Sequence, residues 1–290
     1  LNSALLDEPG ADSVITAGEV AKLLGGASLT LAASKTISVA AAVNWSSGSS
    51  LTLTAGTSID VAQKIENSGS GAITLNAGSG GISLGANVAS GGTVTLDSGG
   101  AIAQSAGRVS AATLVLEGGG SFGTSTANRN EISAASVTLN KSGGAVFIEN
   151  FRAGGVSLSG TSTGATVDVV SRDAAGTAAQ PLTVGASGLT AGSVALNGST
   201  VTVTGDLTAT ASGASIVAAT DATITGDIDV DNAVSITFGS AAAGVLTLSG
   251  SITAPDDLGA TGGANGDSIV LNALSIGTAT FDGGGGTDKV

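Results

Sequence analysis

A short phrase of alternating apolar and polar residues recurs along the chain at a nearly constant interval. It reads "LTL" at Leu29 and Leu51, "ITL" at Ile73 and "VTL" at Val94. Up to about residue 160 the phrase starts at residues 29, 51, 73, 94, 114, 137 and 156, so the interval stays close to 21 residues. Self-similarity at a fixed period of this length is typical of repeat proteins whose units stack on one another.

Each repeat contains two further apolar anchors. A second phrase follows the first after about eight residues, and alternation over three to five residues indicates a half-buried strand. The second phrase begins at Ile37, Ile59, Ile82 and Ile102, and the third anchor lies at Val43, Ile65, Val88 and Val109. Gly, Ser, Asn and Ala separate these segments. The repeat therefore predicts three short strands per unit of roughly 21 residues.

One such unit cannot fold alone. About six inward aliphatic side chains contribute ~1.5–3 kcal/mol each, whereas ordering the unit costs about 1.5 kcal/mol per residue. Stacking supplies shared burial and backbone hydrogen bonds. We therefore predict an all-β parallel β-helix of roughly 13 coils. The alternative, an antiparallel sandwich or barrel, would show hairpin turns and no fixed period.

The register predicts which side chains face outward and which face the core. Leu53, Leu75 and Leu96 hold equivalent places and should form one inward column. The middle residues of the first phrase should point outward: Thr30, Thr52, Thr74, Thr95, Val115, Thr138 and Ser157. The polar residues after the phrase suit a ladder of stacked turns: Thr54, Asn76, Asp97, Glu117, Asn140, Ser159, Asn197 and Asn272.

We expect one β-helix domain over residues 1–290, with three parts. Residues 13–28 contain a helix near 17–24, because Thr16 and Glu19 have capping-box spacing and Gly25 and Gly26 follow. Val20, Leu23 and Leu24 should pack on the first coil. Residues 29–160 form regular coils. Residues 161–290 form less regular coils, with 171–182 and 254–267 as the best loop candidates.

Composition excludes several classes of function. The chain has no Cys, His, Met or Tyr, so disulfides, Cys/His zinc sites and His- or Cys-dependent triads are ruled out. The net charge of −13 disfavours nucleic acid and anionic membranes as partners. High apolar content with only 11 % charged residues argues against disorder. The apolar runs are too short to span a membrane.

The segment "ITAGEVAKLLGGASLTLAASKTISVAAAVNWSSGSSLTLTAGTSIDVAQKI" resembles bacterial exoproteins of the filamentous haemagglutinin type, which are exported by two-partner secretion. The short helix at 17–24, "SLTLAASKTISVAAAVNW" and "SSLTLTAGTSIDV" carry the resemblance. It is clearest over residues 13–100 and continues more loosely to about 253. It implies a right-handed β-helical fibre on the Gram-negative surface. The NPNG-like motifs of the secretion domain do not occur, and the carboxyl end stops after a strand, so we expect a shaft segment.

Catalytic and metal sites are not expected. Polysaccharide lyases and hydrolases of this fold need clustered carboxylates or a base beside calcium, whereas the acidic residues here are scattered and the arginines share no repeat position. We therefore predict no enzyme activity, no catalytic residues and no cofactor. "GGGGTDKV" (283–290) contains one copy of a calcium-binding nonapeptide pattern, with Asp288 as ligand, but such sites use consecutive copies. Paired threonine ranks could bind ice, but the second rank near the first strand is irregular.

The expected function is structural and adhesive. It would act in adhesion, aggregation or biofilm matrix as part of a protein that is secreted or held on the bacterial outer surface. The expected partners are a host or bacterial surface glycan or exopolysaccharide, and an outer-membrane secretion partner that acts through a part of the protein outside this chain. The alternative is a carbohydrate-binding or carbohydrate-active parallel β-helix. A groove lined by clustered acidic and aromatic residues would favour that alternative.

Overall fold

The computed structural model of the chain is a parallel β-solenoid of about 11 turns with about 22 residues per turn. It describes residues 3–5, 13–272, 278–287 and 289. The predicted all-β parallel fold is confirmed, but the expected 13 coils were too many. The difference arises because residues 13–28 are used by a helix and its flanks, and because loops lengthen several later coils. Contacts divide the chain into two compact units, Leu1–Ala145 and Val146–Val290.

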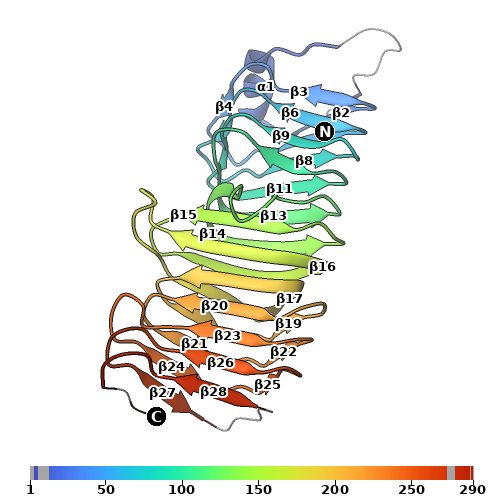
Figure 1. Cartoon of the computed structure of the whole chain (residues 1–290). Coiled ribbons are helices and arrows are strands. Elements are labelled where there is room, and N and C mark those ends of the chain that lie inside the picture. Colours follow the sequence, from blue (N-terminus) through green and yellow to red (C-terminus); the bar gives the residue numbers. More distant parts are fainter. Residues whose placement is uncertain (1–2, 6–12, 273–277, 288, 290) are drawn as a thin grey trace. The chain divides into compact units, whose positions relative to one another are not determined.

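In the first unit the strands stack in three columns, each strand parallel to its equivalent one coil on (Figure 1). The first column contains β1 (Ser3–Leu5), β2 (Leu29–Ala33), β5 (Leu51–Ala55), β8 (Ile73–Ala77) and β11 (Thr93–Ser98). The second contains β3 (Thr36–Ser38), β6 (Ser58–Val61), β9 (Gly81–Leu84) and β12 (Ile102–Gln104). The third contains β4 (Val43–Trp45), β7 (Ile65–Asn67) and β10 (Val88–Ser90). Two longer strands, β13 (Val109–Gly118) and β14 (Asn130–Lys141), continue the third column and then the first.

The second unit also has three columns of strands. Two long bent strands form the beginning of these columns. These are β16 (Val156–Arg172) and β17 (Leu182–Gly198), and β15 (Val146–Phe151) pairs with the end of β16. The first column continues as β18 (Val201–Val203), β21 (Ala222–Ile224), β24 (Val245–Leu248) and β27 (Ser268–Leu271). The second continues as β19 (Leu207–Ala209), β22 (Ile228–Val230) and β25 (Ile252–Thr253). The third continues as β20 (Ala214–Ala218), β23 (Val234–Thr237), β26 (Leu258–Thr261) and β28 (Ala279–Asp282).

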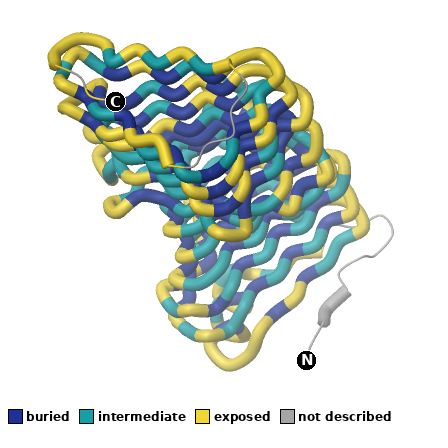
Figure 2. The backbone as a smooth tube through the Cα atoms, turned by 90° about the horizontal axis from the view of Figure 1, so that it is seen from below, coloured by how far each residue is buried: buried dark blue, intermediate teal, exposed yellow. Residues whose placement is uncertain are grey.

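The core is built from in-register aliphatic columns. Leu53 pairs with Leu75 and Leu75 with Leu96, and all three are at most 3 % exposed, so the predicted inward column is confirmed. Buried residues alternate with more exposed ones along the strands, while the turns are mostly exposed (Figure 2). This alternation follows from the two-residue period of a strand, which sends successive side chains to opposite faces.

The predicted helix is present as α1 (Ala17–Leu24). Thr16 and Glu19 form the capping box, and Gly25 is the C-cap residue. Val20 and Leu24 are buried against the first coil, but Leu23 is 43 % exposed, so its predicted contact with the coil is wrong. The helix has only two turns and contacts β4 and β2 along one narrow stripe. Positions i and i+4 lie on that stripe, and Leu23 falls on its flank.

Two glycine columns let neighbouring turns approach closely. A Cβ added to Gly78 would lie 2.0 Å from the carbonyl oxygen of Gly56, and one added to Gly56 would lie 2.1 Å from that of Ser34. The second unit repeats the arrangement, with a Cβ on Gly250 at 2.1 Å from the oxygen of Gly226. Any side chain at these turns would push the coils apart, which would stretch the backbone hydrogen bonds of the adjacent strands.

The two loop candidates have different outcomes. Residues 173–181 do connect β16 to β17 as a loop, in which the Asp173 carboxylate accepts hydrogen bonds from the backbone N–H groups of Thr177 (2.8 Å) and Ala178 (3.3 Å). The prediction for 254–267 is wrong in part, because β26 lies inside it. Leu258 and Ala260 are buried in register with β23, and Gly259 between them weakened the sequence signal.

The inward column can be tested by a pair of neighbouring substitutions. Leu75→Asp places an unpaired charge in the core and should destabilise the fold by several kcal/mol. Thr74→Asp, one residue away and facing outward, should change stability little. Thermal unfolding of both variants followed by circular dichroism measures the difference. Equal losses of melting temperature would contradict the register.

The glycine columns predict a second contrast. Gly78→Ala should destabilise the protein by roughly 1–3 kcal/mol, as overpacking does, because the new methyl group meets a backbone carbonyl. Gly48→Ala is the control, because its Cβ would meet nothing closer than the Ser70 hydroxyl at 4.0 Å. Denaturant unfolding should show a loss for Gly78→Ala alone. A neutral Gly78→Ala would mean that the coils are not in close contact at this turn.

Candidate functional site

The outward row predicted for the first strand exists in the first unit. Thr30, Thr52, Thr74 and Thr95 pair in register on successive coils, and Val115 and Thr138 continue the row. Ser157 faces outward in the second unit, where it pairs with Thr183. Apart from Val115, the row is a stack of short polar side chains.

The predicted ladder of turn residues is largely wrong. All but Asn272 lie inside strands, as residues of β5, β8, β11, β13, β14, β16 and β17 rather than of turns: Thr54, Asn76, Asp97, Glu117, Asn140, Ser159 and Asn197. Thr54, Asn76, Asp97, Glu117 and Asn140 pair in register as a second outward row. The strands are longer than the three-residue phrase, because an outward polar residue is solvated and does not end a strand.

Acidic side chains come together in that second row. Asp97 and Glu117 are register partners on neighbouring coils, and the amide of Asn140 donates to Glu117 (3.1 Å). Burial, and to a smaller degree the charge of Glu117, raises the pKa of Asp97. Two like charges on adjacent strands explain the second contribution.

A buried lysine follows this row and was not predicted. Lys141 occupies an inward position of β14 opposite Gly118, where the earlier coils have small residues such as Ala77 and Ser98. Its side chain is 2 % exposed, and Nζ donates to the carbonyl oxygens of Gly118 (3.4 Å) and Gly120. Burial lowers the pKa of Lys141 to about 8, although Asp97 partly opposes this shift. The sequence around Lys141 gave no signal that this side chain is buried.

Three further carboxylates have ion-pair partners. Glu66 pairs with Lys64 (2.7 Å), Glu131 with Arg108 (3.0 Å) and Glu149 with Arg172. These ion pairs are partly exposed, and such pairs contribute about 0–1 kcal/mol each. Within the described part of the chain, no three acidic side chains are close enough to hold a metal ion. The calcium ligand considered at Asp288 lies outside the described residues.

Two buried polar side chains, those of Asn67 and Asp267, form hydrogen bonds with the backbone of turns. Asn67 accepts hydrogen bonds from the backbone N–H groups of Ser47 (3.3 Å) and Gly69 (2.9 Å), and it donates to the carbonyls of Ser47 and Gly71. Asp267 accepts from the N–H of Gly244 (2.7 Å) and is 1 % exposed. Both side chains bond to turn backbone and so hold the turns of neighbouring coils together.

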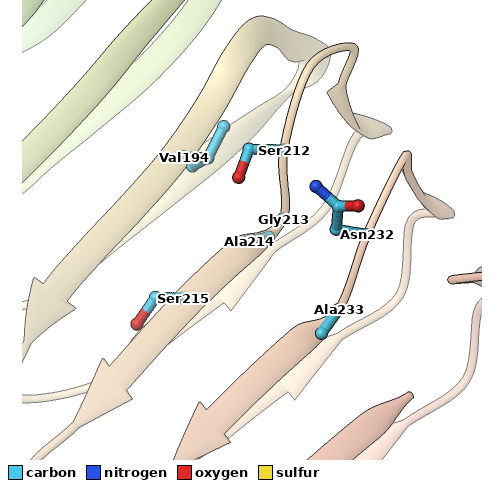
Figure 3. Close-up of a pocket in the computed structure, with 7 residues that line it drawn as sticks. All are labelled: Val194, Ser212, Gly213, Ala214, Ser215, Asn232 and Ala233. Carbon is cyan, nitrogen blue, oxygen red and sulfur yellow. The ribbon is translucent and has the colours of Figure 1, made fainter. Parts of the chain in front are cut away.

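The second unit carries a hollow on its surface and a distinct charge. The hollow lies between the loops before β20 and β23, with Ser212 and Asn232 at its rim and Gly213 and Ala233 behind them (Figure 3). It has no charged lining residue.

From residue 173 to residue 288 the only charged side chains are aspartates, so this unit repels polyanions.

No protein-family model, curated protein sequence or solved structure matches the chain. Among the residues that the structure describes, no helix is long and apolar enough to cross a membrane. The parallel β-solenoid is therefore shown by the structure and not by similarity to a known protein. The expectation that the chain has no enzymatic activity stays a prediction.

The buried lysine makes stability depend on pH in a defined window. The ordinary pKa of 10.5 falls to about 8 in the folded protein, so between these values the unfolded chain retains a proton that the folded chain has released. The free energy of unfolding of the wild type, relative to Lys141→Met, should then rise with pH by up to about 1.4 kcal/mol per unit. Below pH 8 this difference should be constant. Denaturant unfolding from pH 7 to 10.5 measures it, and parallel pH profiles would contradict the burial of Lys141.

Proposed function

We propose that the chain is a structural and adhesive segment of a bacterial cell-surface or secreted exoprotein of the filamentous haemagglutinin type. The observation that carries the proposal is the regular parallel solenoid with about 22 residues per turn. It agrees with the fibre-like β-helix that the sequence resemblance over residues 13–100 implies. Two-partner secretion through an outer-membrane protein, acting on a part outside this chain, belongs to the same proposal.

The physical basis of adhesion would be repetition. Successive coils present similar outward side chains at a constant spacing along the stack. A weak contact made by one coil can therefore be made again by the next. Linked weak contacts raise the overall affinity far beyond that of one contact. The outward residues are mainly Thr, Ser and Asn, which hydrogen-bond well to the hydroxyl groups of glycans. A host or bacterial surface glycan or exopolysaccharide is therefore the proposed partner.

One observation favours the alternative of a carbohydrate-active β-helix. Asp97 and Glu117 stand on neighbouring coils, and the raised pKa of Asp97 is the property that a general acid needs. A carbohydrate-active enzyme would also need a groove over this pair to hold the sugar chain. Adhesion is therefore the proposal that we retain, and hydrolysis is an outcome that its test can detect.

A glycan array probed with the fluorescently labelled chain tests the proposal. We expect saturable binding to one or more glycans, and beads coated with the chain should adhere to surfaces bearing those glycans. A double variant, Leu75→Asp with Ile224→Asp, places a buried charge in each unit and should lose both activities, because the coils that repeat the contacts no longer stack.

Two results would contradict the adhesive function. One is wild-type binding no greater than that of the double variant on every glycan. The other is the release of new reducing ends from a polysaccharide panel, abolished by Asp97→Asn, which would establish the carbohydrate-active alternative.

A further inference from the structure

Six hydroxyl groups stand in two rows on three consecutive coils of the second unit. Thr202, Thr223 and Thr247 are the outward residues of β18, β21 and β24, and they pair in register. The second row follows two residues later and consists of Thr204, Thr225 and Ser249. Backbone N–H groups of this second row donate to Val184, Val203 and Ile224 of the preceding coils at 3.0, 2.8 and 2.8 Å, so the ladder extends through it. We call these six residues the hydroxyl grid.

The grid is held by a completely buried inner face. The inward neighbours of the first row are all 0 % exposed: Val201, Val203, Ala222, Ile224, Leu246 and Leu248. Hydroxyl groups should therefore repeat at about 4.8 Å along the stacking direction and about 6.7 Å along each strand. Such spacing is set by the backbone and costs a ligand little to organise, because the side chains are short and the five threonines are β-branched.

Charge beside the grid restricts what can bind. Asp206 and Asp227 stack at the adjacent turn, where the N–H of Asp227 donates to the Asp206 carboxylate (3.2 Å) and the N–H of Ser251 to the Asp227 carboxylate (2.8 Å). The hydrogen bonds from Ser251 lower the pKa of Asp227, so this carboxylate is ionised at neutral pH. With aspartate as the only charged residue type from 173 to 288, an anionic polymer would be repelled.

We propose that the hydroxyl grid binds a neutral, linear polysaccharide that lies along the stacking direction of the coils. An extended β-linked hexose chain advances per sugar by close to one strand spacing, so successive sugars can meet successive threonines. The inference rests on the proposed adhesive function and names its ligand class and its surface. Ice is a poorer match, because the ionised aspartate row interrupts the lattice and the Thr225 hydroxyl donates to the carbonyl of Val203 (3.2 Å).

The test replaces threonine by valine, which removes a hydroxyl group and keeps the shape of the side chain. In the first variant, Thr202→Val, Thr223→Val and Thr247→Val delete one row of the grid. In the control variant, Thr190→Val, Thr208→Val and Thr253→Val make the same changes at outward positions of β17, β19 and β25 in the second column. Thermal unfolding first shows that both variants fold, since outward Thr→Val changes leave the core intact. Binding to a soluble, uncharged β-linked glucan and to its carboxymethylated form is then measured.

We expect the grid variant to bind the neutral glucan about tenfold more weakly or worse, because several hydrogen bonds are lost together. The control variant should bind like the wild type, and the carboxymethylated glucan should bind the wild type poorly. Equal losses in the two variants, or equal affinity for the charged glucan, would overturn the assignment. Wild-type binding to other glycans but to no neutral polysaccharide would overturn it and leave the adhesive function standing. Binding to no glycan at all would overturn both.

Discussion

The fixed spacing between neighbouring coils, imposed by backbone hydrogen bonds between parallel in-register strands, is the constraint on which the structure depends. Each coil donates to both of its neighbours: the N–H of Leu51 donates to Ala72 of the next coil, and the N–H of Gly56 donates to Ala33 of the preceding coil, both at 2.9 Å. The spacing sets the inner columns, because aliphatic side chains in register at this distance fill the core at close-packed density. It also sets the turns, because Gly56 and Gly78 leave no room for a side chain.

The same constraint determines what was predictable. The period of the phrase identified the strands, and it placed Leu53, Leu75 and Leu96 correctly, because burial at each position depends only on the repeat. The capping box at Thr16 and Glu19 is similarly local. By contrast, the sequence could not show that Asn76 and Asp97 continue their strands, because polar residues suit both a turn and an outward strand position. The β26 strand was missed because Gly259 occupies its outward position.

Features that depend on three-dimensional surroundings gave no sequence signal. Lys141 is buried because the preceding coil has Gly118 and Gly120 beside it, and their carbonyls receive its ammonium group. Asn67 and Asp267 are similar, since each bonds to backbone of turns distant in sequence. On the outer face, the proposed glycan binding depends on no single residue. It would follow from short hydroxyl side chains that recur on successive coils at a constant spacing, which is a property of the stack.

The register between coils is the central claim, and disulfide formation tests it most directly. The chain has no cysteine, so a pair of cysteines can be introduced at Thr52 and Thr74, which are register partners. Their Cα atoms should be about 4.8 Å apart, within the range of roughly 4.4–6.8 Å that a disulfide spans. Thr52→Cys with Asn76→Cys is the control, at a diagonal of about 7–8 Å. Efficient oxidation of the first pair and not of the second is the predicted result, whereas equal oxidation of both, or preference for the diagonal pair, would contradict the stacking described.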